Sequence, residues 1–242
     1  MNKNVDVSVI LCAYNEENVI AKAIDTVDHV LKEEGWNYEI IVVDDGSFDD
    51  TKERATCYRD KNGGDYLKVL GYRKNTGKGN AVKTGFKEAD GDFIVIIDSD
   101  LDVDPGHIPR YIEALKTGDV AVASKWHPES NTSITLTRKV LSFGFNILSR
   151  LLTGIKLRDT QTGLKAFRRS VLERMVPKLV VKRYAFDLEL MAACNHCGFK
   201  IADLPVSVHI KSIIDLNQIF RMAFDLFRVA YRLRVLKYYQ RG

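Results

Sequence analysis

The first half of the chain alternates between apolar runs and stretches that read as helices. The apolar runs are rich in Val and Ile and end in polar or turn residues, which is typical of strands buried on both faces. Strands that alternate with helices in this way indicate a parallel sheet covered by helices on its two faces. The pattern predicts strands at 7–14, 38–47, 66–72 and 92–100, with helices at about 16–34, 50–60 and 77–89.

The second half continues with less regular spacing. Its segments are a strand at 120–126, a Ser/Thr-rich loop to 137, a largely apolar helix at 138–154, a loop leading into a short strand or helix at 158–172, an amphipathic helix at 184–198 and a last edge strand at 199–210. The simplest partition is one α/β domain over 1–210, followed by a C-terminal helical extension over 211–242.

The extension has its own pattern. Residues 215–242 read as a long helix on which Arg221, Asp225, Arg228 and Arg232 form one narrow polar stripe, while most other positions are apolar or aromatic. Six basic residues stand against two acidic ones. Such a helix suits the headgroup region of a membrane. Packing against the sheet or at a dimer interface is the alternative, and each description can hold for a different face.

Polar residues gather where the predicted strands end. The segments 13–16, 44–47 and 98–100 each follow a strand, and ligands bind at the carboxyl ends of strands in open α/β sheets. The run FIVIIDSDLDVDP (93–105) places four aspartates directly after an apolar run. Mg²⁺ or Mn²⁺, held by one or two carboxylates plus phosphate oxygens, would remove their mutual repulsion. A D-x-D pattern alone is weak evidence for such a site.

Composition narrows the function classes. The net charge of +4 is small, and the basic residues outside the tail are interleaved with acids, which argues against nucleic-acid binding. Four cysteines are too few for a disulfide framework, and Cys194–Cys197 has no second cysteine pair with which to bind zinc, so a reducing, cytoplasmic setting fits. The N-terminal apolar run is too short for a signal peptide, and no run approaches ~18 apolar residues. Any membrane contact is expected to be peripheral.

Four motifs in the first 105 residues occur together in one family. VSVILCAYNEE, YEIIVVDDGSFDDT, N-x-G-K-G-x-A and the D-S-D that closes a strand appear in the order of the family 2 glycosyltransferases, which have the GT-A fold. Further on, SKW (124–126), RDTQTGLKAFRR (158–169) and RYAFDLEL (183–190) resemble the glycosyltransferases that act on polyprenyl phosphates. Within these, D-T-Q-x-G-x-K and A-F-D-x-E-L are more similar to dolichyl-phosphate glucosyltransferases than to dolichyl-phosphate mannose synthases.

The resemblance implies roles for particular residues. The metal ligands would be Asp98, Asp100 and Asp102, although mannose synthases often have glutamine at the third position. Catalytic or acceptor-side residues would be Asp100, Lys125, Arg138, Asp159 and Asp187, with Lys125 standing where the family usually has arginine. The donor nucleotide sugar would contact Cys12, Tyr14, Glu16, Val43, Asp44, Asp45, Lys78, Asp98, Ser99 and Lys211.

The implied reaction is inverting transfer of a hexose from a nucleotide diphosphate to dolichyl or polyprenyl phosphate, on the cytoplasmic face of a membrane. UDP-glucose is the favoured donor, with GDP-mannose second. A lipid phosphate is already anionic, so a general base is less necessary than for a sugar hydroxyl. Transfer to a saccharide hydroxyl and an inactive nucleotide-sugar-binding module are the alternatives, since QIFRM (218–222) partly matches the Q-x-x-R-W motif of polysaccharide synthases. A homo-oligomer is left open.

Overall fold

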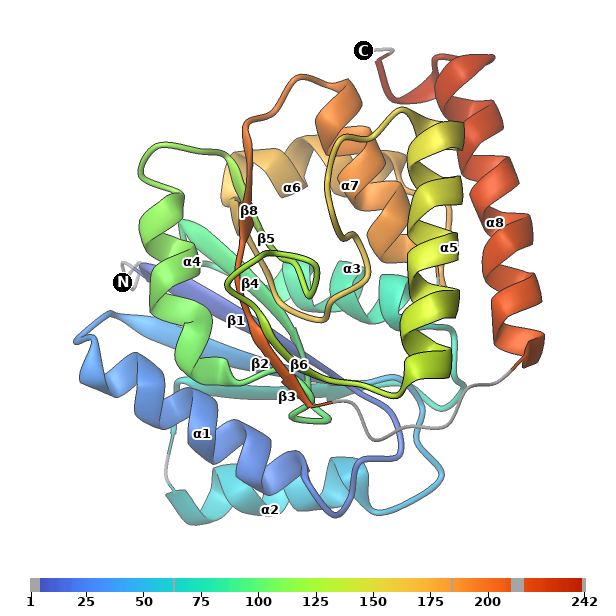
Figure 1. Cartoon of the computed structure of the whole chain (residues 1–242). Helices are drawn as coiled ribbons and strands as arrows, with labels where there is room; N and C mark the ends of the chain where they lie inside the picture. Colours follow the sequence, from blue (N-terminus) through green and yellow to red (C-terminus); the bar gives the residue numbers. More distant parts are fainter. Residues whose placement is uncertain (1–4, 63, 184, 210–215, 241–242) are drawn as a thin grey trace.

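The computed structural model describes residues 5–62, 64–183, 185–209 and 216–240. Within these residues, seven strands form one sheet in the order β3-β2-β1-β4-β7-β5-β8 (Figure 1). Neighbouring strands are parallel except that β7 runs antiparallel to both β4 and β5. A separate pair, β6 and β9, is parallel. The predicted α/β architecture with a mostly parallel sheet is confirmed.

The strands and helices of the first half lie close to their predicted positions. In chain order they are β1 (Val7–Ala13), α1 (Ile20–Glu33), β2 (Tyr38–Asp44), α2 (Thr51–Asn62), β3 (Leu67–Gly71), α3 (Lys78–Glu88) and β4 (Phe93–Asp98). Helix α1 begins four residues later than predicted, because the carbonyl of Glu16 accepts from the amides of Val19 and Ile20 in a turn that precedes the helix.

The second half contains more short elements than predicted. They are η1 (Pro105–His107), α4 (Ile108–Ala114), β5 (Val120–Ala123), β6 (Asn131–Ser133), α5 (Leu136–Thr153), β7 (Lys165–Arg168), α6 (Arg169–Met175), η2 (Val176–Lys178), α7 (Phe186–His196), β8 (Ile201–Leu204), β9 (Ser207–His209), α8 (Leu216–Arg234) and η3 (Tyr238–Gln240). The predicted edge strand at 199–210 is divided: β8 forms the sheet edge, and β9 leaves it to pair with β6.

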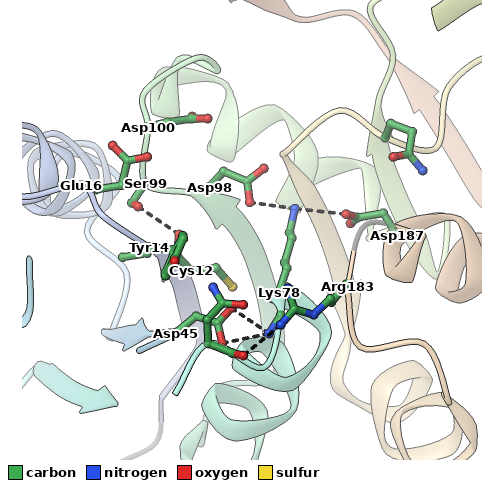
Figure 2. A pocket seen from close by; sticks show the side chains of 14 residues that line it. Cys12, Tyr14, Glu16, Asp45, Lys78, Asp98, Ser99, Asp100, Arg183 and Asp187 are labelled. Carbon is green, nitrogen blue, oxygen red and sulfur yellow. Dashed lines mark hydrogen bonds and ion pairs between the residues drawn. The ribbon is translucent and has the colours of Figure 1, made fainter. Parts of the chain in front are cut away.

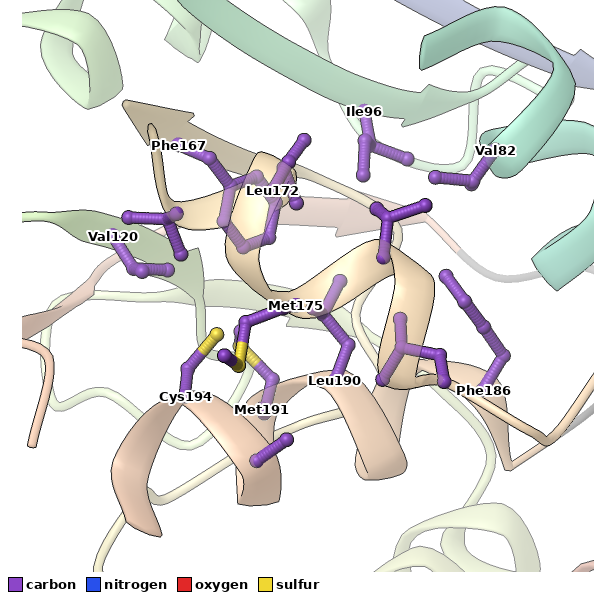
Figure 3. Packing of buried hydrophobic residues seen from close by; sticks show 14 of the residues in the cluster. Val82, Ile96, Val120, Phe167, Leu172, Met175, Phe186, Leu190, Met191 and Cys194 are labelled. Carbon is purple, nitrogen blue, oxygen red and sulfur yellow. The ribbon is translucent and has the colours of Figure 1, made fainter. Parts of the chain in front are cut away.

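Two apolar clusters sandwich the sheet, because successive strand side chains point to opposite faces. On β1, Ile10 belongs to one cluster, and Val9 and Leu11 belong to the other. The Ile10 side is covered by α3, α6 and α7, and the opposite side by α1, α2 and α4. Figure 3 shows the first cluster, where Leu172 and Met175 of α6 lie between the sheet and Leu190, Met191 and Cys194 of α7.

Helix α7 differs from the prediction for 184–198. The sequence pattern predicts an amphipathic helix, but every residue from Phe186 to Cys194 is buried. The helix lies between α6 and α3 on one side and α8 on the other, so it has no solvent-facing side over this length. Its two buried carboxylates, Asp187 and Glu189, are each paired with cations.

The C-terminal helix is part of the same core. Val229 and Leu233 of α8 and Tyr239 of η3 belong to the cluster on the α7 side of the sheet. Helices α5 and α8 lie side by side (Figure 1). Within the described residues, the predicted boundary near 210 therefore does not separate two independent cores. The alternative description of the tail, a helix packed on the protein, holds for the face that carries Val229 and Leu233.

The outward faces of α5 and α8 are apolar. On α5 five of the exposed apolar side chains recur at helical spacing, which places them in one stripe. On α8 the exposed set occupies a different face from the buried Leu226, Val229 and Leu233. We call these two stripes the α5–α8 apolar surface; it comprises Leu136, Val140, Phe143, Ile147 and Leu151 of α5, and Phe224, Phe227 and Tyr231 of α8. No helix in the described parts of the chain combines the length and apolar character needed to span a bilayer.

Candidate active site

A pocket of about 610 Å³ lies at the carboxyl ends of β1 and β4. The three predicted polar clusters meet there, together with residues from the α3 entry and from the α7 side (Figure 2). This position is where α/β sheets bind ligands. The lining residues are Cys12, Ala13, Tyr14, Glu16, Asp45, Asn75, Gly77, Lys78, Asp98, Ser99, Asp100, Gln161, Arg183 and Asp187.

Asp45 shapes one wall of the pocket. Its carboxylate accepts hydrogen bonds from the amides of Thr76 and Gly77 and from the hydroxyl of Tyr72, at 2.9, 2.8 and 2.6 Å. These bonds fix the turn that begins α3. Gly77 has a φ of +102°, and a Cβ there would lie 2.2 Å from the carbonyl oxygen of Lys182, so the turn requires glycine.

Lys78 connects two carboxylates across the pocket floor. Its Nζ lies 2.7 Å from Oδ1 of Asp98 and 3.2 Å from Oδ2 of Asp187, as Figure 2 shows. The other oxygen of Asp187 lies 2.8 Å from Nζ of Lys165, which is 1% exposed. Burial alone would lower the pKa of Lys78, but Asp187 and Asp98 raise it above the usual lysine value. The four groups form an alternating chain of charges, in which Asp187 lies between two ammonium groups.

Asp187 is therefore a poor general base. Burial would raise its pKa, but the ammonium groups of Lys165 and Lys78 lower the pKa below that of an ordinary aspartate. A carboxylate held ionised by two lysines has little tendency to accept a proton. Its geometry instead suits the positioning of Lys78 at the pocket.

Glu16, Asp98 and Asp100 crowd one side of the pocket. Desolvation, followed by the charges of Asp100 and Asp102, raises the pKa of Glu16 to about 7. Partial enclosure, followed by the charge of Asp98, raises the pKa of Asp100 to about 6. Carboxylates with raised pKa values repel one another in the ionised form, and a cation placed among them would relieve that repulsion. The chemistry of these side chains fits a divalent cation.

The predicted three-aspartate ligand set is not assembled as a unit. Asp98 and Asp100 line the pocket, whereas Asp102 is not among the lining residues. The amide of Asp102 donates to Oδ1 of Asp100 across a local turn, at 2.9 Å. Within the described residues, no group of three His, Cys, Asp or Glu side chains is placed to hold a metal ion. A cation at this position would need oxygens from the donor's diphosphate to complete its coordination.

Of the other residues predicted to contact the donor, some line the pocket and others lie behind its lining. Tyr14 and Cys12 line the pocket, and burial raises the pKa of the Cys12 thiol far above its usual value, so this group stays protonated. Ser99 also lines it, with its hydroxyl donating to the carbonyl of Cys12 at 2.9 Å. Val43 and Asp44 lie outside the lining; Asp44 accepts from the amide of Ser47 at 3.2 Å and so shapes the loop beside Tyr14.

The structure describes only some of the residues predicted on the acceptor side. The side chains of Lys125 and Asp159 form an ion pair with little exposure to solvent, and neither residue lines the pocket. Arg138 lies in α5, but the structure does not describe its side chain. Lys211 lies outside the described residues.

Arg183, Gln161 and Lys165 are among the residues of the site that were not predicted from the sequence. Arg183 lines the pocket, and its Nη2 donates to the carbonyl of Asn75 at 3.0 Å. Gln161 also lines it, and its buried Nε2 has no hydrogen-bond partner in the described chain, so it is available to a ligand oxygen. Lys165 pairs with Asp187 beneath the pocket. Each stands in a quoted motif, RDTQTGLKAFRR or RYAFDLEL, which is the signal that could have found it.

The comparisons with known proteins agree with this geometry. The family model described as Glycosyl transferase family 2 matches residues 8–176. This range includes the pocket residues at the carboxyl ends of β1 and β4. The chain belongs to glycosyl transferase family 2. The resemblance predicted from the motifs is confirmed, and the chain is a glycosyltransferase.

Similar curated proteins carry related names. The chain is 28% identical to a dolichyl-phosphate beta-glucosyltransferase of Dictyostelium discoideum, covering 95% of this chain and 75% of that protein. It is 32% identical to the human dolichyl-phosphate beta-glucosyltransferase, covering 83% and 66%. It is 31% identical to glycosyltransferase AglD of Haloferax volcanii, covering 96% of this chain but 38% of that protein.

Solved structures confirm the fold. Glucosyl-3-phosphoglycerate synthase of Mycobacterium tuberculosis in complex with UDP superposes with a TM-score of 0.70 at 24% identity, covering 94% of this chain and 79% of that one. Its complex with Mn²⁺, UDP and phosphoglyceric acid gives a TM-score of 0.71 at 23% identity, covering 94% and 78%. The predicted GT-A fold is confirmed by this similarity.

Proposed function

We propose that the chain transfers glucose from UDP-glucose to dolichyl or another polyprenyl phosphate, with inversion at the anomeric carbon. The similarity to proteins named dolichyl-phosphate beta-glucosyltransferase supports the sugar and the acceptor. The proposal that the chain binds a nucleotide-sugar donor rests on the pocket in which Glu16, Asp98 and Asp100 gather at the ends of β1 and β4. Its volume of about 610 Å³ falls in the range of small-molecule sites.

Asp98 and Asp100 are the proposed ligands of Mg²⁺ or Mn²⁺, with Asp102 assigned a supporting position beside them. When bound, the cation supplies positive charge to the diphosphate of the donor. Arg183 extends the positive side of the pocket, and the free amide of Gln161 can donate to a sugar or phosphate oxygen. Tyr14 and Glu16, which line the same pocket, are the proposed contacts of the nucleoside.

The transfer needs positioning more than proton removal. An oxygen of the lipid phosphate attacks the anomeric carbon and forms the new C–O bond, and the bond from that carbon to the diphosphate oxygen breaks to release UDP. The attacking oxygen carries no proton, so no base has to remove one. This agrees with the ionised, lysine-bound state of Asp187 and Asp159. The enzyme's part is to hold two anions in line and to stabilise the departing diphosphate.

The α5–α8 apolar surface is the proposed contact with the membrane. Its large apolar side chains are exposed to solvent, with Leu136 77% exposed and Phe224 59% exposed. The same helices carry the exposed cations Lys139, Arg150 and Arg221, which suit anionic headgroups. On this proposal the chain docks peripherally on the cytoplasmic face of the membrane that holds the acceptor. A homo-oligomer that covers this surface is the competing outcome of a binding test.

The first test is transfer of radiolabelled sugar into chloroform-soluble lipid. UDP-glucose, UDP-GlcNAc and GDP-mannose are supplied with polyprenyl phosphate in vesicles, with Mn²⁺, with Mg²⁺ or with chelator. Asp100→Asn should reduce transfer on the order of a hundredfold, since charge stabilisation at a reacting centre is worth that much. Asp104→Asn is the matched control, because Asp104 is an exposed aspartate of the same loop that is not among the pocket's lining residues.

Each outcome assigns the function differently. Label in lipid from UDP-glucose alone supports the proposal, and label from GDP-mannose would replace the sugar. Label only in 3-phosphoglycerate or a saccharide, supplied as alternative acceptors, would refute the lipid acceptor while keeping the glycosyltransferase. No label from any donor, with UDP still bound, would indicate an inactive nucleotide-sugar-binding module.

A further inference from the structure

Glu189 connects the C-terminal helix to the wall of the donor pocket. Its side chain is fully buried in α7. Oε1 accepts from Nη2 of Arg232 in α8 at 2.9 Å and from the hydroxyl of Tyr239 in η3. Arg232 also donates from Nε to the Tyr239 hydroxyl at 3.0 Å. Three side chains from three elements therefore form one closed network around a single carboxylate oxygen.

The second oxygen of Glu189 holds a segment of backbone. Oε2 accepts from the amides of Val180 and Val181, at 2.9 and 2.7 Å. These two residues belong to the connection between η2 and α7, in which none of the residues that the structure describes lies in a strand or helix. The carboxylate thus accepts hydrogen bonds from two consecutive backbone amides, which would otherwise need partners on a neighbouring strand or in water.

The same segment forms part of the donor pocket. The carbonyl of Lys182 accepts from the amide of Gly79 at 2.8 Å, which ties the segment to the first turn of α3. Arg183, the next residue, lines the pocket and bonds the carbonyl of Asn75 at 3.0 Å. Segment 180–183 therefore contacts the turn that carries Lys78 and supplies a cation to the pocket.

A small cavity lies on the other side of this segment. It has a volume of about 250 Å³ and separates the segment from α8. Its lining residues are Thr76, Val180, Val181, Lys182, Arg183, Asp225, Arg228 and Arg232. The network around Glu189 connects the segment and the helix beside this cavity, because Arg232 and the amides of Val180 and Val181 bond the same carboxylate. The polar stripe predicted on α8 thus faces this cavity in part.

We propose that Arg232 and Tyr239 are positioning residues for donor binding, which they support through Glu189 by holding residues 180–183 as one wall of the pocket. This inference rests on the proposed function of the pocket as the donor site. It implies that the pocket has its full wall only when α8 is packed against α7. The helix proposed to lie against the membrane would then also affect the affinity for the donor. Neither residue touches the donor.

The test compares variants of the full chain in two measurements. The first is hydrogen exchange at Val181 and Gly79 without ligand, and the second is the affinity for UDP with Mn²⁺, followed by KM and kcat for UDP-glucose. Arg232→Gln and Tyr239→Phe should both speed exchange at the two amides and weaken UDP binding about fivefold or more, as is typical of coupling between sites. The KM for UDP-glucose should rise more than kcat falls, and Arg232→Lys should restore part of the affinity.

Arg228→Gln is the matched control. Arg228 lies on the same helix and lines the same cavity, but its ion-pair partner is Asp225, at 3.8 Å, rather than Glu189. Its variant should keep wild-type exchange and affinity. Wild-type exchange and affinity in folded Arg232→Gln and Tyr239→Phe would overturn the inference. A wild-type chain that binds no UDP would refute the proposed donor site instead, while exchange at Val181 and Gly79 would still decide whether the network holds the segment.

Discussion

The ammonium group of Lys125 lies 3.1 Å from Oδ2 of Asp159, and the two side chains are only 8% and 3% exposed. The same carboxylate accepts from the amides of Lys125 and Gln161 and from the hydroxyl of Thr162, at 3.2, 2.8 and 2.6 Å. Burial alone would raise the pKa of Asp159, but Lys125 and these hydrogen bonds lower it. The pair therefore orders the D-T-Q-T-G loop, which carries Gln161 into the pocket.

Asp159→Asn should destabilise the fold strongly. It leaves the buried ammonium of Lys125 without its counter-charge, which typically costs about 3–5 kcal/mol. Because the folded-state pKa is lowered, the contribution of Asp159 is fully present above the ordinary value of 3.8 and declines as the pH falls below it. Urea unfolding of both chains at pH 7 and near pH 3 measures this. Glu129→Gln, which breaks the exposed pair with Arg110, should change stability by less than about 1 kcal/mol.

An equal loss at both pH values would contradict this account. It would mean that Asp159 acts through packing or through hydrogen bonds that asparagine cannot make, rather than through its charge. The control variant distinguishes a specific effect of burial from a general effect of removing a carboxylate.

The buried strands were predictable because their hydrophobic runs are continuous, whereas the pairing of charges was not. Lys125 and Asp159 are 34 residues apart, and only the antiparallel insertion of β7 between β4 and β5 brings their loops together. Lys165 is buried against Asp187, which lies in a different element. The sequence pattern predicts an amphipathic helix over 184–198, yet Asp187 and Glu189 are both buried, and cations from other elements neutralise them. The hydrophobic periodicity of a sequence predicts which apolar residues are buried. It does not predict which charged residues, far apart in the chain, pair with one another.

Glu16 should destabilise the unliganded fold at alkaline pH. Its pKa is raised to about 7 from 4.5, so its ionised form is the unfavourable one. The penalty is present above pH 7, shrinks between pH 7 and 4.5, and vanishes below the unfolded-state value. Glu16→Gln should therefore raise the melting temperature at pH 8 and leave it unchanged near pH 4.5. Mn²⁺ with UDP should reduce the difference at pH 8, since a nearby cation removes the repulsion; a constant difference across pH would contradict the assignment.

Gly163 should be intolerant of a side chain because of its distance from Asp98. A Cβ at this position would lie 2.4 Å from Oδ2 of Asp98, so alanine must push that carboxylate out of place. Gly163→Ala should weaken Mn²⁺-dependent UDP binding on the order of tenfold, as loss of a ligand's supporting contacts does at metal sites. Calorimetry with UDP and Mn²⁺ measures the effect. Gly144→Ala is the control, since nothing lies within 4 Å of its Cβ position; equal affinities for the two variants would contradict the expectation that donor binding needs the Asp98 carboxylate in its present position.

The α5–α8 apolar surface should bind lipid independently of the donor pocket. Leu151→Glu and Phe227→Glu each remove a large exposed apolar side chain, 68% and 55% exposed, and add a negative charge. Because burying such a side chain contributes about 1.5–3 kcal/mol, each change should lower partition into anionic vesicles about tenfold or more. Co-sedimentation with vesicles measures partition, and calorimetry should show unchanged UDP affinity.

Phe48→Ser is the control for this experiment. Phe48 is 85% exposed but lies in the loop after β2 and belongs to neither α5 nor α8, so its loss should leave vesicle binding unchanged. If Leu151→Glu and Phe227→Glu keep wild-type partition but convert a dimer to a monomer in sedimentation, the surface is an interface between two copies of the chain. Loss of vesicle binding with an unchanged oligomeric state would instead place the lipid acceptor's membrane against these two helices, next to the pocket wall that α8 supports through Glu189.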